Sequence, residues 1–220
     1  NDNPFEYTQQ SKHFKYYINN VSLFDINYIF RARNFLHLEK LGSKLNKLHL
    51  PYYCNLLHYC DANNISNENP LTDALFLGHA ENDMRLDCFD FLLKNKINLK
   101  LGGGNFHQNS KGRLFSILLP VKYFYNEEYR KEISNSLCTL CFFSSLNHDV
   151  ITTRVFEIIA CGGLLVCQRK GFVETIFKEG EEALYFSTKE ELLEKILFLK
   201  NNPKARTKII IAGRKKLYST

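Results

Sequence analysis

The sequence lacks several features that mark specialised classes of protein. It contains no apolar run near the ~20 residues that cross a bilayer, and no positively charged start followed by an apolar signal segment. No stretch of the chain is repeated within it. We therefore expect a cytoplasmic protein without a transmembrane helix or a solenoid. The chain begins at Asn1 rather than at a methionine, so we also expect residues upstream of it.

The composition is that of an ordinary globular protein. Hydrophobic residues make up 45% of the 220 residues and charged residues 24%, which lies inside the usual range for soluble domains. This length holds one large or two small domains with a substantial core. Seven cysteines is an odd number, which favours free thiols in a reducing compartment.

The cysteine pattern admits two interpretations. Cys138 and Cys141 form a Cys-x-x-Cys, a spacing found in zinc and redox sites. They lie in an apolar run typical of a strand, where an odd offset sends two side chains to opposite faces. Cys161 and Cys167 flank a second apolar run. The sequence therefore favours small core residues over a metal or redox site.

The positive charge is concentrated at the end of the chain. Residues 187–220 hold nine Lys and Arg against three Glu, and this difference equals the net charge of +6. Such a segment could attract an anionic membrane surface or a polyanion. The alternative is a solvated terminal helix. The basic residues that would form such a surface are Lys200, Lys204, Arg206, Lys208, Arg214, Lys215 and Lys216.

The first part of the chain has the pattern of a β-α-β piece. Residues 1–10 are polar and predict an irregular start, and residues 52–71 lack periodicity and predict an interdomain connection. Between them the pattern predicts a helix over 12–20, a strand over 25–30, a helix over 34–41 before Gly42, and a short strand over 47–50.

Beyond residue 71 short apolar runs alternate with amphipathic segments. This alternation predicts an α/β fold with a parallel sheet covered by helices on both faces. The expected strands are 74–77, 99–101, 118–121, 137–143, 164–167 and 183–186. The expected helices are 85–94, 126–135, 152–161, 172–178, 189–200 and a last one after Pro203.

The most informative segment runs from Asn147 to Gly163. It leaves an expected strand and enters an expected helix that stops at two glycines. In such sheets ligands bind beyond the carboxyl ends of the strands, and a helix N-terminus offers N–H groups and partial positive charge suited to a diphosphate. Arg154 lies to one side of this helix, where it is placed to donate two hydrogen bonds to a phosphate.

The same helix has two distinct faces. At 100° per residue, Thr153 and Glu157 point away from the apolar stripe and stack on each other. A charged face opposite a core stripe is usually solvated, and that interpretation of Glu157 stays open. The apolar stripe consists of Ile151, Val155, Ile158 and Ile159.

With two further segments, this motif resembles the donor-binding half of a GT-B glycosyltransferase. The match is carried by residues 154–163, 174–177 and 190–192, and from Leu71 onward it covers about two thirds of the chain. The resemblance is nearest to the CgeB-like (spore maturation protein type) family. It implies a Rossmann-like C-terminal domain over 72–220, a linker over 52–71, and the remnant of an acceptor-side Rossmann-like domain over 1–51.

The resemblance also assigns roles to single residues. In retaining GT-B enzymes the second glutamate of a Glu-x7-Glu motif binds the ribose hydroxyls, and Glu157 occupies that place. Asp149 stands at the first acidic position, which meets the donor sugar. Aspartate is one methylene shorter than the glutamate of the motif, and the N-cap of the following helix is an equal alternative for it. His148, beside it, is placed to assist the leaving diphosphate.

Weaker candidates lie after the other strands. The resemblance places donor phosphate contacts near Gly78 and Arg85, where a plain turn with a surface arginine is the alternative. The segment with Val121 and Tyr123 matches a region whose backbone reads the nucleobase. Residues 102–104 are three glycines that do not fit Gly-x-Gly-x-x-Gly, so a turn is favoured over a phosphate cradle.

The resemblance implies a hexosyltransferase that moves a sugar from a nucleoside diphosphate, such as a UDP- or GDP-sugar, to an unknown glycan, lipid or protein. The chain contains no Asp-x-Asp, which fits a metal-independent reaction without a cofactor. No general base is evident, so retention through front-face departure is expected.

Two other classes of function remain open. One is a catalytically inactive relative that serves as a structural or interaction module. The other is a nucleic-acid-binding protein that uses the basic end of the chain. Its positive residues are not interleaved with aromatics, as stacking on bases requires, so we expect no nucleic acid partner, and weak contact of the basic end with a membrane surface is an added expectation.

Overall fold

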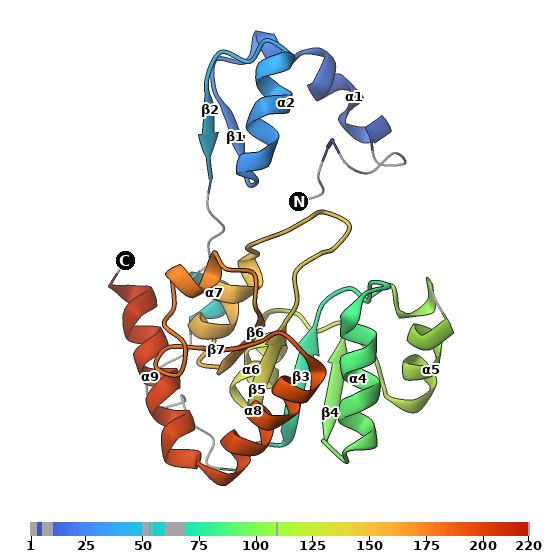
Figure 1. Cartoon of the computed structure of the whole chain (residues 1–220), viewed down its shortest axis with the longest axis vertical. Coiled ribbons are helices and arrows are strands. Elements are labelled where there is room, and N and C mark those ends of the chain that lie inside the picture. The colour runs from blue at the N-terminus through green and yellow to red at the C-terminus, as the bar shows by residue number, and fades with distance from the viewer. Residues whose placement is uncertain are drawn as a thin grey trace. The chain divides into compact units, whose positions relative to one another are not determined.

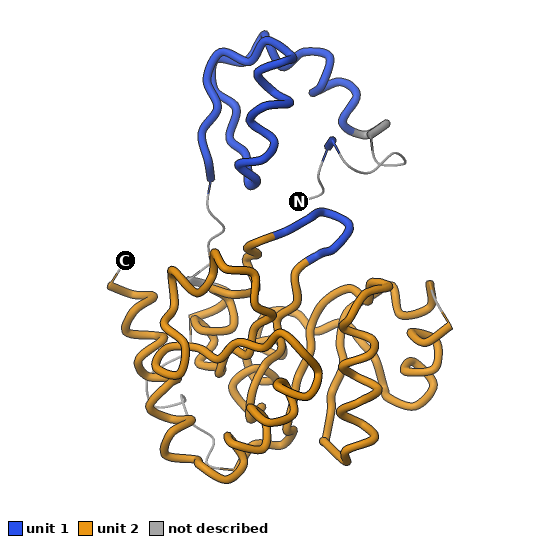
Figure 2. Tube along the Cα trace, viewed as in Figure 1, with its two compact units in different colours: residues 1–51, 144–149 blue, residues 52–143, 150–220 orange. Residues whose placement is uncertain are grey.

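A computed structural model describes residues 4–5, 11–49, 53, 55–59, 69–108 and 110–219. The chain divides into two compact units, of which unit 1 comprises residues 1–51 and 144–149, and unit 2 comprises residues 52–143 and 150–220 (Figure 2). Most of the expected irregular start, and residues 60–68 of the expected linker, lie outside the described residues.

Unit 1 contains the β-α-β piece that the sequence predicts. Its two strands pair in parallel, with Asn27 opposite Asn46. Val21, Ile29 and Leu38 form its small buried core. The elements are α1 (Ser11–Asn19), η1 (Val21–Leu23), β1 (Asn27–Ile29), η2 (Ala32–Asn34), α2 (Phe35–Lys40) and β2 (Asn46–Leu48).

Unit 2 is built on a parallel sheet of five strands in the order β4-β3-β5-β6-β7 (Figure 1). The strands are β3 (Thr72–Leu77), β4 (Leu99–Gly102), β5 (Ser136–Cys141), β6 (Leu165–Gln168) and β7 (Leu184–Phe186). The helices are α3 (Asn55–His58), α4 (Met84–Lys94), η4 (Phe106–Gln108), α5 (Ser110–Leu118), α6 (Asn126–Ser134), α7 (Thr153–Ala160), η5 (Val173–Thr175), α8 (Lys189–Asn201) and α9 (Pro203–Tyr218).

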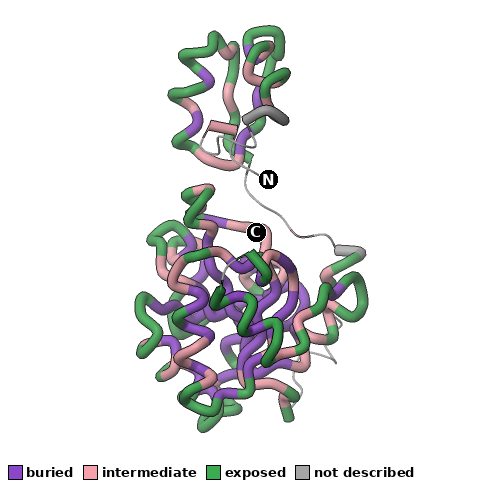
Figure 3. The backbone as a smooth tube through the Cα atoms, turned by 90° about the vertical axis from the view of Figure 1, so that its right-hand side faces the viewer, coloured by how far each residue is buried: buried purple, intermediate pink, exposed green. Residues whose placement is uncertain are grey.

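Each face of this sheet is covered by its own set of helices. Because side chains alternate along a strand, Cys138 and Leu140 of β5 lie in one buried cluster with residues of α4, α5 and α8. Cys141 lies in the other, with residues of α6 and α7. Every residue of β5 is buried, and Figure 3 shows buried chain running through the centre of unit 2. The expected parallel sheet with helices on both faces is confirmed.

The described cysteines are buried free thiols. They are Cys88, Cys138, Cys141, Cys161 and Cys167. Burial raises the pKa of Cys138 to about 12, so its thiol stays protonated and unreactive at neutral pH. Cys138 and Cys141 point to opposite faces, as expected. Among the described residues no group of three or more His, Cys, Asp or Glu could hold a metal ion.

Two expected elements are wrong. No strand forms over 118–121 in the described structure: Leu118 is the last residue of α5. The nearest strand-like pairing is an isolated bridge between Gly102 and Lys122. Pro120 has no N–H to donate to a ladder. The helix expected over 172–178 is only the single turn η5, since the Tyr185 hydroxyl donates to the Val173 and Phe177 carbonyls and fixes that segment differently.

The basic end of the chain is an ordered helix whose arginines are partly structural. Arg206 is 3% exposed and donates to the carbonyls of Leu137 and Ser136, each at 2.8 Å. Arg214 is 6% exposed and lies 5.5 Å from the centroid of the Tyr218 ring. The basic segment is therefore not uniformly solvated. Among the described residues no helix is long and apolar enough to cross a membrane.

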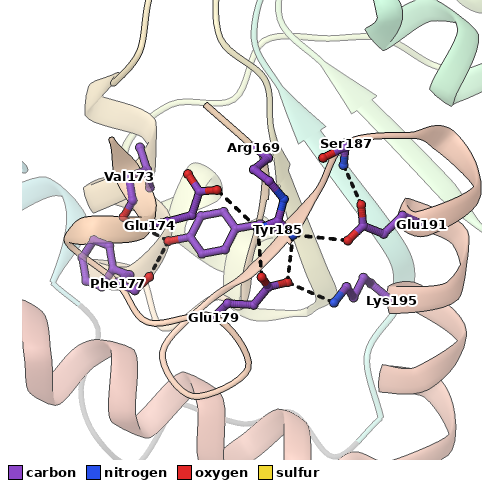
Figure 4. Close-up of polar contacts among 9 residues, drawn as sticks. All are labelled: Arg169, Val173, Glu174, Phe177, Glu179, Tyr185, Ser187, Glu191 and Lys195. Atoms are coloured by element: carbon purple, nitrogen blue, oxygen red, sulfur yellow. Dashed lines mark hydrogen bonds and ion pairs between the residues drawn. The ribbon is translucent and has the colours of Figure 1, made fainter. Parts of the chain in front are cut away.

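An ion-pair network around Arg169 links β6 to the following loop and to α8 (Figure 4). The guanidinium contacts Glu179 through two nitrogens at 2.9 and 3.1 Å, and Glu174 and Glu191 at 3.3 Å each. Lys195 adds a second cation 3.1 Å from Glu179. Glu174 and Glu191 come from two of the segments that carry the family resemblance, and Arg169 joins them.

The glycine cluster at the end of β4 is a tight turn against the end of β3. Gly103 has φ +112°, a backbone conformation that residues with a side chain rarely adopt. A Cβ at this position would lie 2.0 Å from the Gly78 carbonyl oxygen. The Gly78 N–H in turn donates to the Gly102 carbonyl at 2.9 Å. The two loops therefore pack backbone against backbone, which supports the interpretation as a turn.

We predict that Gly103→Ala lowers the free energy of unfolding by about 3 kcal/mol or more, because positive φ costs roughly 1–3 kcal/mol and the methyl group also meets the Gly78 backbone. The matched control is Gly171→Ala, at φ +82° with no described atom within 4 Å of the added Cβ. Urea denaturation of both variants measures the difference. Equal losses would show that the close approach to Gly78 carries no cost.

Candidate functional site

The candidate site lies at the carboxyl edge of the sheet in unit 2. The chain order of the strands reverses between β3 and β5, which are direct neighbours with Leu75 opposite Thr139. Open parallel sheets bind ligands beyond this switch point, where the loops on the two sides diverge. The loops that follow β3 and β5, together with the helices α4 and α7 that they lead into, carry most of the residues that the sequence singles out.

Arg85 is buried under this edge rather than exposed. It is the second residue of α4, is 3% exposed, and donates to the His79 carbonyl at 2.6 Å and to the Phe143 carbonyl at 3.0 Å. Its Nε and Nη2 also bind the Asp83 carboxylate at 2.8 Å each. The alternative of a surface arginine is thus wrong, and Arg85 joins the loop after β3 to the end of β5.

The segment expected to read a nucleobase lies beside the glycine turn. The Gly103 N–H donates to the Lys122 carbonyl at 2.9 Å, between Val121 and Tyr123. Tyr123 is 54% exposed, and its hydroxyl lies so close to Gly104 that a Cβ there would be 2.2 Å away. The structure therefore brings this segment and the loops after β3 and β4 together.

Helix α7 presents an uncapped N-terminus. Thr152 is its N-cap residue, with extended φ −147° and ψ 156°, and within the described residues its side chain makes no capping hydrogen bond. The first N–H groups of a helix have no intrahelical acceptor. Thr153, the first helical residue, is partly exposed. This end of α7 is consequently suited to an anion.

The other end of α7 is closed in the way that the sequence suggests. Gly162 has φ +77°, its N–H donates to Ile159, and the Gly163 N–H donates to Ile158 at 2.9 Å. This pair of bonds is a Schellman motif. A Cβ on Gly163 would lie 2.4 Å from the Ile133 side chain of α6. The glycines thus allow α6 to pack closely on α7.

Arg154 connects α7 to the end of β3. Its guanidinium donates to the Leu77 carbonyl, and its Nε lies 3.3 Å from Glu157 Oε2. The guanidinium carbon lies 5.5 Å from the centroid of the Tyr129 ring. Its side chain remains 29% exposed. Arg154 is therefore held at the switch point while part of it faces solvent.

Glu157 is not a solvated surface residue. Its side chain is 17% exposed, because helices α6 and α3 cover the polar face of α7. Tyr129 of α6 donates its hydroxyl to Glu157 Oε2 at 2.9 Å. His58 of α3 places Nε2 at 3.9 Å from Glu157 Oε1. The interpretation as a solvated helix face is therefore wrong for Glu157.

Sequence reasoning missed both of these neighbours. His58 falls inside the segment that the sequence treats as a linker, where a single turn of helix leaves no periodicity to detect. Tyr129 lies on α6, a largely polar helix whose other apolar residue is the buried Ile133. A lone aromatic residue at such a position was the one available signal. The two rings contact each other edge to face, with centroids 5.9 Å apart.

Asp149 and His148 belong to unit 1 and are described with it. Arg31 binds Asp149 Oδ1 through Nε at 2.7 Å and through Nη2 at 2.5 Å. Their side chains are 10% and 16% exposed. Because α7 begins at Thr153 with Thr152 as N-cap, the alternative of Asp149 as the N-cap is wrong. His148 is exposed, with φ +51°.

Comparison with protein families gives one match. A family model described as glycosyl transferase-like matches residues 85–219, which is more than half of the chain. The comparison with curated proteins found no match.

Several solved structures have the same fold. HepE from Anabaena, solved in complex with UDP and glucose, is 12% identical with a TM-score of 0.69, covering 99% of this chain and 64% of that one. Sucrose-phosphate synthase from Thermosynechococcus elongatus is 15% identical with a TM-score of 0.65, covering 96% and 59%. TarM is 12% identical with a TM-score of 0.65, covering 100% and 45%. The expected GT-B fold is confirmed, and this chain spans about half to two thirds of these relatives.

We predict a specific pH dependence of stability from His58. Burial lowers the pKa of His58, with Arg154 and Arg130 acting in the same direction and Glu157 opposing them. As the pH falls, the unfolded chain, with a histidine pKa of about 6.5, therefore binds a proton at a higher pH than the folded protein does. The contribution of neutral His58 to stability is therefore complete above pH ~6.5 and is lost as the pH falls through that value towards the lower folded pKa.

The measurement compares urea denaturation of the wild type and His58→Gln between pH 5 and 7.5. We expect the stability advantage of the wild type to shrink as the pH falls. His107→Gln is the control, because His107 is exposed. A constant difference across this pH range would contradict the expected shift.

Proposed function

Because the chain belongs to the glycosyl transferase-like family, we propose that it binds a nucleoside diphosphate sugar and forms the donor side of a glycosyltransferase. The proposed enzyme moves a sugar, of hexosyl type, from that donor to a glycan, lipid or protein acceptor. The CgeB-like resemblance and a cytoplasmic location remain predictions that accompany this proposal.

The observation that carries the proposal is the arrangement of Glu157 and Arg154 on α7. A carboxylate and a guanidinium lie three residues apart on one helix, with Nε and Oε2 at 3.3 Å. Arg154 also reaches the carbonyl of Leu77 at the switch point. A nucleoside diphosphate requires an acceptor for its ribose hydroxyls and donors for its phosphates, and this helix offers both within one turn.

We propose uracil as the base of the nucleotide. HepE was solved with UDP-glucose, with UDP, and with UDP and glucose, and the T4 phage protein BGT was solved with its UDP-glucose substrate. BGT is 14% identical with a TM-score of 0.54, covering 84% of this chain and 56% of that one. These likenesses support a UDP-sugar over a GDP-sugar, and the titration below includes both.

The proposed roles follow the edge of the sheet. Glu157 accepts hydrogen bonds from the ribose hydroxyls. The N–H groups at the start of α7, with Thr153 and Arg154, bind the diphosphate. Gly78 in the loop after β3, and Arg85 at the start of α4, support the phosphates from the side of β3. The backbone of the segment with Val121 and Tyr123 contacts the nucleobase.

We propose a retaining, metal-independent transfer. The bond between the anomeric carbon and the diphosphate oxygen breaks while the α7 N–H groups and Arg154 stabilise the leaving charge. The acceptor oxygen bonds to the anomeric carbon on the same face and passes its proton to the departing phosphate oxygen. Asp149 contacts the donor sugar and His148 assists the leaving group. Arg31 binds Asp149. For Asp149 to contact the sugar, its carboxylate must either bind Arg31 and the sugar together or release Arg31.

The domain boundaries are part of the proposal. Residues 72–220 form the nucleotide-sugar-binding domain, residues 52–71 the connection, and residues 1–51 part of an acceptor-side domain.

A catalytically inactive relative would bind the donor without transferring or hydrolysing it. Release of UDP from a UDP-sugar in the presence of candidate acceptors distinguishes an enzyme from such a module.

We predict that the chain binds UDP and that Glu157→Ala weakens this binding about ten- to a hundredfold. A hydrogen bond to a charged group contributes roughly 1.5–3 kcal/mol, which corresponds to that range of affinity. Isothermal titration with UDP, GDP and their glucose conjugates provides the measurement. Circular dichroism checks that the variant is folded.

Glu194→Ala is the matched control, because Glu194 is exposed on α8. Its affinity for UDP should equal that of the wild type. An unchanged dissociation constant in Glu157→Ala would remove the proposed ribose contact. A wild type that binds neither nucleotide would overturn the proposed function.

A further inference from the structure

The two oxygens of the Glu157 carboxylate have different surroundings. Oε2 accepts the Tyr129 hydroxyl at 2.9 Å and lies 3.3 Å from Arg154 Nε. Oε1 lies 3.9 Å from His58 Nε2, which is beyond hydrogen-bond distance. A carboxylate accepts hydrogen bonds at both oxygens, so with respect to the described residues Oε1 keeps the larger part of its accepting capacity.

The Tyr129 ring is held on two sides. The Arg154 guanidinium lies over it at 5.5 Å, and the His58 ring meets it edge to face at 5.9 Å. Arg154 is itself bonded to the Leu77 carbonyl. The ring therefore has little freedom to swing, and its hydroxyl is directed at Glu157. Burial raises the pKa of Tyr129 well above its ordinary value, so the hydroxyl remains a donor at neutral pH.

We propose that Tyr129 is a positioning residue for nucleotide recognition: its hydroxyl fixes Glu157 Oε2 and thereby presents Oε1 to the ribose hydroxyls. This inference rests on the proposed function and adds a residue to it. Tyr129 touches neither the sugar nor the phosphates, and acts through the Glu157 carboxylate.

The physical reason is the freedom of a glutamate side chain. A glutamate has three rotatable bonds, and ordering them when the ligand arrives opposes binding. A side chain that is already fixed in its binding geometry avoids this loss. The Tyr129 hydroxyl supplies the fixation from α6, while Arg154 supplies it from the same helix as Glu157. Among the described residues, the Tyr129 hydroxyl provides the hydrogen bond that ties the carboxylate to a different element of the fold, whereas His58 of α3 lies 3.9 Å away.

The test removes this hydroxyl and varies the ribose. Tyr129→Phe keeps the ring that packs against Arg154 and His58 and deletes only the donor. The ligands are UDP and 2′,3′-dideoxyuridine diphosphate, which lacks the ribose hydroxyls. We expect the wild type to bind UDP at least about tenfold more tightly than the dideoxy compound, since the lost hydrogen bonds are to a charged group.

In Tyr129→Phe we expect the dissociation constant of UDP to rise about tenfold, because the Glu157 carboxylate loses the hydrogen bond that fixes it. That of the dideoxy compound should change less than about twofold, so the preference for the hydroxyls nearly disappears. The double variant with Glu157→Gln should lose no more of this preference than Glu157→Gln alone, because both changes act on one carboxylate.

Tyr185→Phe is the structural control. Its hydroxyl is also buried and donates to two carbonyls, at 2.7 and 3.1 Å, but it lies in the loop network of Figure 4. We expect this variant to lose stability and to keep the wild-type preference for UDP over the dideoxy compound.

The outcomes separate the two proposals. If the wild type binds UDP and Tyr129→Phe keeps the full preference for the ribose hydroxyls, the positioning role is wrong and the proposed function stands. Equal weakening towards both ligands would make Tyr129 merely structural and would also overturn the inference. If the wild type binds no nucleoside diphosphate, the proposed function fails and the positioning role fails with it.

Discussion

The carbonyl groups at the ends of the parallel strands must find hydrogen-bond donors, and arginines supply them. Arg154 donates to the Leu77 carbonyl at the end of β3, and Arg85 to the Phe143 carbonyl just beyond β5. At the opposite end of β5, Arg206 donates to Ser136 and Leu137. A buried carbonyl without a partner is costly, and a guanidinium has five donors in a rigid fork. The carboxyl end of β3 and both ends of β5 are therefore fixed from three helices.

This constraint decides what the positive charges can do. Arg206 and Arg214 come from the basic end of the chain, yet both are buried against carbonyls or aromatic rings. The charge count alone overstates the basic surface that this end offers to a polyanion or a membrane. Arg154 differs from them because its side chain stays partly exposed. It combines a structural bond with a place at the edge where a phosphate is expected.

The candidate site depends on the packing of three helices as much as on any motif. Glu157 comes from α7, Tyr129 from α6 and His58 from α3, and these residues lie 28 and 71 positions apart along the chain. The small residue Gly163 lets α6 approach α7 closely, since a Cβ there would meet Ile133 at 2.4 Å. The polar face of α7 is thus enclosed, and a carboxylate that sequence periodicity places on a surface is instead held by neighbours.

Most of the architecture could be predicted from local patterns, since alternation of apolar runs and amphipathic helices reports directly on a parallel sheet with two covered faces. The opposite orientation of Cys138 and Cys141 follows from the same two-residue period. The strand expected over 118–121 was wrong because Leu118 still belongs to α5 and Pro120 has no N–H to donate to a ladder. The short turn η5 was missed because tertiary hydrogen bonds from Tyr185 fix its carbonyls.

The sequence by itself determined the periodicities, the helix that stops at Gly162, and the presence of an arginine and a glutamate three residues apart on it. These depend on neighbours within a few residues, which local spacing encodes. Only the tertiary structure decided the partners of those side chains: Leu77 and Tyr129 for Arg154, Tyr129 and His58 for Glu157, Arg31 for Asp149. Such contacts join residues distant along the chain, because they form when separate elements pack, and no local pattern specifies which elements will meet.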